Sequence, residues 1–303
     1  MPELRGRSIN VFLPARDAAG VLRCSIANWI GVAYRVPRTE LDAFKSREEL
    51  NYNGVYLLFG EDAETGKGIV YVGQAQKRKT GGGLMARLLE HSRNEDEDYW
   101  TEVVVLTTIN DSFGPTEISY LENRFCNLAG EAHRYTIRNR LDPTPGNLTE
   151  PKRCEMEDYI DDAKLVIRTM GYRVFEPISA PVCENHEQRT VFHLQRTVAG
   201  DAVSAEGIRT AEGFAVLRGS RIRLQEDEGI PAKIKAERRS AAKSEDGVLL
   251  EDVLFTSPSY AAIFVIGKSE NGQTAWKTTD SLAGREITLK EFEAQQITET
   301  TSV

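Results

Sequence analysis

The sequence contains no long hydrophobic run, which excludes a membrane-spanning helix because such a helix needs roughly 18 to 20 consecutive apolar residues. The first ten residues, MPELRGRSIN, also lack the basic and then apolar pattern of a secretory signal. We therefore expect a cytoplasmic protein with no membrane partner. With 303 residues, of which 40% are hydrophobic, the chain is long enough for two or three domains with separate cores.

Cysteine and histidine are both scarce, with four of each in the chain. Cys24, Cys126, Cys154 and Cys183 form no CxxC pair and have no histidine at the spacing that zinc sites use. This pattern argues against a zinc site. We expect reduced thiols that serve mostly as small packing groups.

The sequence also lacks a marked excess of positive charge, since its formal net charge is −8. Residues 54–150 hold 10 basic and 15 acidic side chains, whereas affinity for DNA comes largely from Lys and Arg that neutralise phosphates. Positive charge is local, and Lys77, Lys79, Arg218 and Arg221 are weak candidates for nucleic-acid contacts. These residues are equally well explained as ordinary charged side chains on solvent-exposed surfaces. This pattern predicts weak general affinity for DNA, so that target selection needs particular contacts or a partner.

Segments of strand-forming composition and segments of helical periodicity alternate along the first 178 residues. Strands are predicted at 8–13, 54–60, 69–75 and 101–108. Helices are predicted near 38–50, 83–93, 115–130 and 154–171, the last followed by a short strand. Residues 21–37 fit either a helix or a hairpin.

Polar, unpatterned residues at 179–190 predict a linker between two domains. We expect residues 1–53 to form an extension packed on a domain at 54–178, and residues 191–303 to form an accessory domain. The second domain has strand-like segments at 192–196 and 213–224 and an apolar run near 261–267.

Two tripeptides stand out, GVY at 54–56 and YVG at 71–73, separated by fourteen residues. They are followed in order by an arginine and a histidine four residues apart, a glutamate within the predicted helix at 115–130, and a later asparagine. This succession resembles the GIY-YIG nuclease family, and the residues concerned are Tyr56, Tyr71, Arg87, His91, Glu122 and Asn139. The resemblance implies an α/β domain of α+β type, with a small antiparallel sheet flanked by helices.

The resemblance also implies an activity, the hydrolysis of DNA phosphodiester bonds one strand at a time. Its cofactor is Mg²⁺, or Mn²⁺ in its place, held by Glu122. Arg87 and His91 would contact the scissile phosphate, and Tyr71, helped by Tyr56, would activate water.

The chemistry of these residues agrees with the resemblance. One carboxylate suffices for Mg²⁺, because this ion keeps several of its waters. On a helical wheel Glu122 lies at the edge of the apolar stripe, where it is half sheltered. Arg87 and His91 project from one side of their helix and offer donors for phosphate oxygens. The alternatives are a solvated glutamate, two exposed helix residues and two core tyrosines.

One residue departs from the family pattern. Several relatives have a lysine directly after the second tripeptide, where this chain has Gln74, and Lys77 or Lys79 is a substitute at a different position. Slower cleavage is one consequence that we expect. Asn139 is the weakest of the transferred positions, because it follows Glu122 at a longer distance than in compact relatives.

The C-terminal region resembles a domain of unassigned function that is often found behind GIY-YIG domains in bacterial proteins. Its characteristic segments lie at 219–220, 257–259, 267, 271–272 and 276–277. Ser257 or Ser259 fits the N-cap of a helix better than a nucleophile, because no histidine follows His193. Trp276 fits either a base-stacking side chain or a core residue.

The sequence thus favours a magnesium-dependent DNA endonuclease whose C-terminal domain targets or regulates it, with a protein partner as one route. Two alternatives remain open, a DNA-binding module that does not cut and a protein-interaction adaptor without affinity for DNA.

Overall fold

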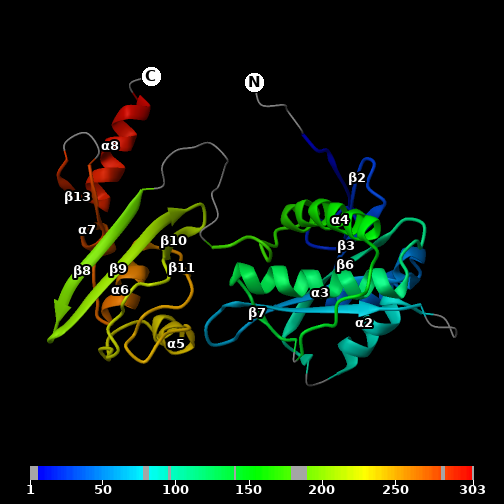
Figure 1. Ribbon diagram of the computed structural model, residues 1–303, viewed down its shortest axis with the longest axis horizontal. Coiled ribbons are helices and arrows are strands. Elements are labelled where there is room, and N and C mark those ends of the chain that lie inside the picture. The colour runs from blue at the N-terminus through cyan, green and yellow to red at the C-terminus, as the bar shows by residue number, and fades with distance from the viewer. Residues whose placement is uncertain are drawn as a thin grey trace. The chain divides into compact units, whose positions relative to one another are not determined.

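The chain folds into two compact units, Met1–Glu176 and Pro177–Val303, each with its own sheet (Figure 1). The structure is a computed structural model that describes residues 6–77, 82–94, 97–139, 141–178, 190–280 and 284–301. Both units combine helices with a largely antiparallel sheet, which confirms the predicted α+β class. No helix in these ranges is long and apolar enough to cross a membrane. The predicted linker lies at residues 179–190, of which the structure describes only residue 190.

The sheet of the first unit has seven strands in the order β1-β2-β3-β6-β4-β5-β7, and its neighbours are antiparallel except for β5 and β7. The strands are β1 (Ile9–Phe12), β2 (Leu22–Ile26), β3 (Gly31–Pro37), β4 (Gly54–Glu61), β5 (Gly68–Ala75), β6 (Trp100–Thr108) and β7 (Thr136–Ile137). Residues 21–37 therefore form a hairpin. The first 53 residues were expected as a packed extension, but they supply three strands of the main sheet, because β3 pairs with β6 along its whole length.

Helices cover both faces of this sheet. On one face α3 (Pro115–Ala132) and α4 (Glu150–Thr169) pack against Val55 and Leu57. The opposite face carries η1 (Arg38–Glu40), α1 (Leu41–Phe44), η2 (Glu48–Asn51) and α2 (Leu84–Arg93). Tyr56 and Leu58 point to that side, because successive strand residues face opposite ways. A strand buried on both faces needs a continuous apolar run, which explains the composition of β4.

The segment after α4 is not the short strand that we predicted. Residues 171–178 form turns, and aromatic side chains fasten them to the core. Tyr172 stacks on Phe59 with ring centroids 3.9 Å apart, and Phe175 stacks on Phe125 at 5.2 Å. The apolar content of this segment therefore reflects packing without strand pairing.

The second unit contains a six-stranded sheet in the order β11-β10-β9-β8-β12-β13. Its strands are β8 (Val191–Val198), β9 (Asp201–Thr210), β10 (Gly213–Val216), β11 (Val253–Phe255), β12 (Lys277–Thr279) and β13 (Glu286–Thr288). Its helices are α5 (Ala232–Ser240), α6 (Pro258–Ile266), α7 (Gly272–Ala275) and α8 (Leu289–Thr301).

Two features of this unit differ from the predictions. The strand predicted at 213–224 ends at Val216, and β9 was not predicted at all. The apolar run near 261–267 is the buried helix α6, since a continuously apolar segment has no periodicity that separates helix from strand. The Ser257 hydroxyl accepts a hydrogen bond from the Tyr260 amide, which confirms its expected N-cap role.

Candidate active site at the edge of strand β5

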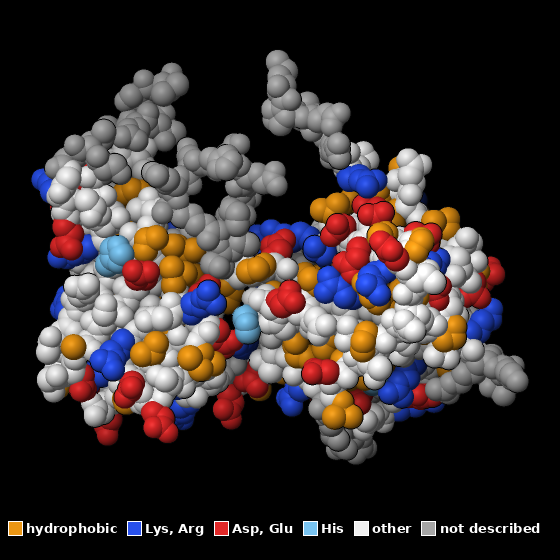
Figure 2. Space-filling view, viewed as in Figure 1, with side chains coloured by type: hydrophobic (Ala, Val, Ile, Leu, Met, Phe, Trp, Pro, Cys, Tyr) orange, Lys and Arg blue, Asp and Glu red, His pale blue; other side chains and the backbone are white. Residues whose placement is uncertain are grey.

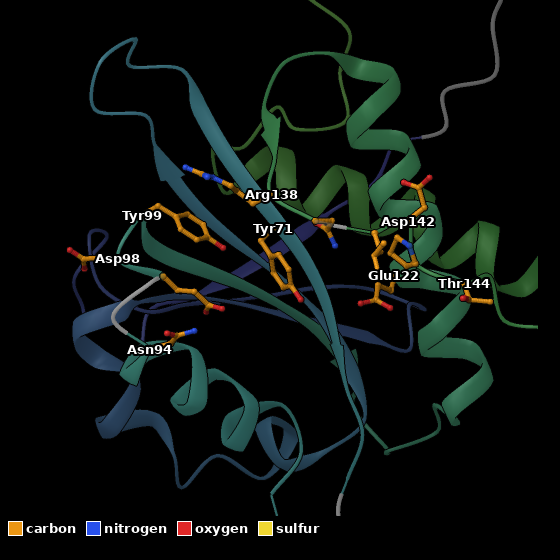
Figure 3. A pocket seen from close by; sticks show the side chains of 12 residues that line it. Tyr71, Asn94, Asp98, Tyr99, Glu122, Arg138, Asp142 and Thr144 are labelled. Atoms are coloured by element: carbon orange, nitrogen blue, oxygen red, sulfur yellow. The ribbon is translucent and has the colours of Figure 1, made fainter. Parts of the chain in front are cut away.

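A cavity of about 1000 Å³ opens beside β5 in the first unit (Figure 3). It forms there because β7 pairs only with Ile69 and Val70, so the following edge of β5 is not covered by a strand. The cavity is lined by Tyr71, Asn94, Glu97, Asp98, Tyr99, Glu122, Arg138, Asn139, Leu141, Asp142, Pro143 and Thr144. Three of the residues predicted from the sequence, Tyr71, Glu122 and Asn139, are among them.

Asn139 substitutes for a neighbouring strand along this edge. Its side-chain oxygen accepts a hydrogen bond from the Val72 amide at 3.0 Å, and its Nδ2 donates to the Val72 carbonyl at 2.7 Å. Both backbone groups of Val72 are thereby satisfied where the parallel pairing ends. The predicted late asparagine thus fixes the middle residue of the second tripeptide.

Glu122 reaches the cavity from α3 and is half-buried, as its place on the helical wheel predicts. Gln74 donates from its Nε2 to the Glu122 carboxylate at 2.9 Å and to Ser119 Oγ at 3.2 Å. Burial raises the pKa of Glu122, and the hydrogen bond from Gln74 opposes this change. The residue that departs from the family pattern therefore contacts the carboxylate proposed for the metal.

The two tripeptides face each other across the β4–β5 pair. Tyr56 is the direct partner of Gly73, and a Cβ at Gly73 would lie 2.3 Å from the Tyr56 hydroxyl oxygen. Glycine is required there because the Tyr56 ring lies across that backbone. The rings of Tyr56 and Tyr71 are 6.2 Å apart between centroids.

Neither tyrosine is activated as a base by its protein surroundings. Burial raises the pKa of Tyr56 and of Tyr71, and the nearby Arg87 guanidinium lowers both without overcoming burial. Glu122 acts on Tyr71 in the same direction as burial. Tyr56 is also almost inaccessible, at 1% exposure, so of the two phenols only Tyr71 reaches the cavity.

His91 does not have the free ring that a phosphate contact requires. It is 4% exposed, and its Nε2 lies 2.8 Å from the Tyr56 hydroxyl while its Nδ1 is hydrogen-bonded to the Glu97 carboxylate. Because both ring nitrogens have protein partners, we replace the expected phosphate contact by a positioning role. Arg87, four residues earlier, is half-exposed and pairs with Glu90 at 2.9 Å.

Charge in the cavity is predominantly negative. Its lining includes four carboxylates, Glu97, Asp98, Glu122 and Asp142, against one guanidinium, Arg138. Within the described ranges, no group of three or more His, Cys, Asp and Glu side chains is arranged to enclose a metal ion. Nor does any described Lys or Arg lie within ion-pair distance of Glu122. A half-buried carboxylate of this kind fits a hydrated divalent cation that takes one protein ligand.

The weak candidates for nucleic-acid contacts are only partly accessible. Trp276 is fully buried and donates from Nε1 to the Pro258 carbonyl, so the base-stacking alternative is wrong and the core alternative holds. Lys77 pairs with Asp111 at 3.0 Å, and Lys79 lies outside the described residues. Arg218 and Arg221 are exposed. Figure 2 shows acidic and basic side chains interspersed over α4, which is the pattern of an ordinary solvated face.

The characteristic segments of the second unit hold one another in place. The Ser259 hydroxyl accepts a hydrogen bond from the Gly272 amide, and the Trp276 indole bonds to the residue before Ser259. A Cβ at Gly272 would lie 2.2 Å from the Pro258 carbonyl group. These residues therefore connect α6 to α7.

Sequence reasoning missed Glu97, Tyr99 and Arg138. Glu97 lies in an acidic run that we assigned to a loop, and no periodicity connects it with His91. Tyr99 and Arg138 flank predicted elements without a motif of their own. Only the approach of four separate chain segments at one cavity identifies them.

Comparison with known proteins identifies a family in the second unit alone. Residues 196–288 match a family described as a domain of unknown function (DUF4357), which agrees with the predicted C-terminal domain of unassigned function. The same comparison gave no match to the GIY-YIG family. No curated protein and no solved structure matches the chain.

Proposed function

We propose that the first unit is a divalent-cation-dependent nuclease that hydrolyses DNA phosphodiester bonds at the cavity beside β5. One observation carries the proposal: Tyr71 and Glu122 line the same open cavity, and Arg87 lies close enough to Tyr56 and Tyr71 to lower the pKa of both phenols. These four residues come from four separate elements, β4, β5, α2 and α3, and their proximity supports the proposal although only Tyr71 and Glu122 line the cavity.

In this proposal Glu122 holds Mg²⁺ or Mn²⁺, and Gln74 fixes the carboxylate through the bond at 2.9 Å. The cation, when bound, supplies positive charge for the phosphoryl oxygens and the leaving 3′ oxygen. Arg87 is the residue that can add planar, permanently charged donors on the other side of the phosphate. Its half-exposed side chain is free to exchange Glu90 for substrate.

Tyr71 is the group placed to orient the attacking water, because its hydroxyl points into the cavity on the same side as the Glu122 carboxylate (Figure 3). Its raised pKa keeps it protonated at neutral pH in the protein alone. Proton removal by Tyr71 therefore depends on positive charge brought by Arg87 and the cation. In this proposal Tyr71 is positioned by its neighbours. Hydrogen bonds join Glu97 to His91 and His91 to Tyr56, and this chain keeps the two tyrosine rings in place.

Nicking of supercoiled plasmid DNA tests the proposal. Full-length protein should nick the plasmid with Mg²⁺ and stop when EDTA is added. The Glu122→Gln variant should lose at least about a hundredfold in rate, because removal of one group that stabilises transition-state charge typically costs that much. Glu131→Gln is the matched control, since it removes an exposed carboxylate from the same helix.

Equal nicking by wild-type protein and Glu122→Gln would overturn the assignment of the site. DNA binding without cleavage at any cation concentration would favour the binding module. The hydrogen bond between Gln74 and Glu122 gives that alternative its physical basis, because it occupies one carboxylate oxygen.

A further inference from the structure

The cavity contains an aromatic ring and a guanidinium that the proposed reaction does not use. Tyr99 and Arg138 both line it, and the Arg138 guanidinium carbon lies 5.4 Å from the centre of the Tyr99 ring. In Figure 3, Tyr71 lies between Tyr99 and Glu122, so the pair is beside the proposed reaction centre and separate from it.

Arg138 is available for an anionic or aromatic ligand. Its side chain is exposed, and no carboxylate in the described ranges lies within ion-pair distance of it. Its backbone amide donates to the Val70 carbonyl at 2.9 Å, which fixes the residue where β7 leaves β5. An arginine stacked on a ring presents a flat surface with donors at its rim, suited to a nucleobase and its phosphate.

Tyr99 directly precedes β6, and its backbone packs closely against Gly60 of β4. The β4–β6 register shifts between Phe59 and Gly60, and a Cβ at Gly60 would lie 1.7 Å from the Tyr99 carbonyl oxygen. This close approach of two backbones requires glycine and sets the direction of Tyr99. The Tyr99 ring is half-buried and has only two side-chain torsions, so it loses little conformational freedom when a ligand stacks on it.

The charge of the cavity indicates which kind of nucleic acid can use this pair. A duplex is held mainly through phosphate contacts with several Lys and Arg side chains. Here the cavity lining contains one guanidinium and four carboxylates. This charge disfavours the binding of a DNA duplex, which brings two closely spaced phosphate backbones. Stacking on an aromatic ring contributes affinity that does not depend on net charge.

We propose that Tyr99 and Arg138 form a base-stacking subsite, so that the strand entering the cavity is single-stranded. This inference rests on the proposed nuclease function and names its substrate class. One unpaired base stacks on the Tyr99 ring, Arg138 contacts its phosphate, and the next phosphodiester lies toward Tyr71 and Glu122. DNA ends, flaps and unpaired segments are then preferred over intact duplex.

Fluorescence anisotropy with a labelled DNA single strand and a duplex of equal length tests the subsite. Measurements on the full chain in EDTA prevent metal-dependent cleavage. The single strand should bind more tightly than the duplex, and Tyr99→Leu should weaken this binding about tenfold, a typical loss for one stacked base. Tyr99→Phe should bind within about twofold of wild type, because it keeps the ring.

Arg138→Gln tests the phosphate contact separately. Its plot of log affinity against log salt should be shallower by about 0.7, as expected for one lost contact with a single strand. Arg153→Gln, which removes an exposed arginine on α4 of the same unit, should leave the slope unchanged. Thermal unfolding of each variant establishes that the fold is retained.

Duplex binding as tight as single-strand binding would overturn the proposal, as would unchanged affinity in Tyr99→Leu and Arg138→Gln together. If either outcome were found while the protein still nicked plasmid DNA, the subsite proposal would fail and the nuclease proposal would remain. If single strands bound in a Tyr99-dependent way but no DNA was cleaved, the subsite proposal would be supported and the nuclease proposal would fail.

Discussion

The Nε2 atom of His91 lies 2.8 Å from the hydroxyl oxygen of Tyr56, in a part of the first unit where both side chains are buried. The other ring nitrogen bonds to Glu97, whose ionised carboxylate can only accept. Nδ1 therefore carries the proton of a neutral His91 ring, and Nε2 accepts the Tyr56 O–H. This direction leaves the lone pairs of the Tyr56 oxygen turned toward its remaining neighbours, including Arg87.

Replacement of Glu97 by glutamine should disturb this chain, and it also removes one of the four carboxylates that line the cavity. The amide can donate as well as accept, so the tautomer of His91 is no longer fixed. We expect the cleavage rate to fall about tenfold to a hundredfold, the usual effect of losing a group that orients a functional histidine. The low-field proton NMR signal of the His91 Nδ1–H should disappear as well. Glu131→Gln, which removes an exposed carboxylate of α3 that does not line the cavity, should change neither property.

Gly73→Ala should destabilise the first unit by about 1–3 kcal/mol, the usual cost of overpacking a core. The new methyl group would overlap the hydroxyl end of Tyr56 and force its ring away from His91. Urea unfolding measures the loss. Gly130→Ala provides the contrast, because its methyl group would meet Ile137 at an ordinary 3.6 Å and alanine favours the helix. Equal stability of the two variants would contradict this account of the second tripeptide.

Glu122→Gln should stabilise the cation-free protein at neutral pH. Burial raises the pKa of Glu122, so the folded state binds its proton more tightly than the unfolded state and ionisation opposes folding. The stabilisation should be about 0.5–2 kcal/mol, as is common when an active-site group is neutralised. It should grow as the pH rises above the ordinary value of 4.5 and vanish below it. Thermal unfolding in EDTA across this pH range measures the effect. A variant that is less stable than wild type at neutral pH would show that the carboxylate has a stabilising partner.

Asn139→Ala should cost about 1–3 kcal/mol, because it leaves the amide and carbonyl of Val72 without the partners that they have at 3.0 and 2.7 Å. Hydrogen exchange at the Val72 amide should accelerate selectively. Asn127→Ala on the exposed side of α3 is the control and should have little effect on either measurement. Unchanged exchange at Val72 would mean that another group satisfies this edge of β5.

Much of the fold followed from local sequence patterns. The segments predicted as strands at 54–60, 69–75 and 101–108 and as helices at 83–93 and 115–130 are present with ends within a few residues. Their signals are strong because alternate faces of each element meet different environments. The strand predictions failed at 171–178, where the aromatic residues pack against the core without strand pairing, and at 217–224, because β10 ends at Val216.

The sequence by itself determined which chemical groups are available and roughly where they occur on their elements. It predicted Tyr71 on a strand, Glu122 at the edge of a helix stripe, and Arg87 one turn before His91. Tertiary structure alone decided how these groups are used. It buried His91 between Glu97 and Tyr56, bonded Gln74 to Glu122, and brought Tyr99 and Arg138 to one cavity. The physical reason is that such contacts join residues far apart in the chain, and local periodicity does not specify which strand edges and helix ends meet.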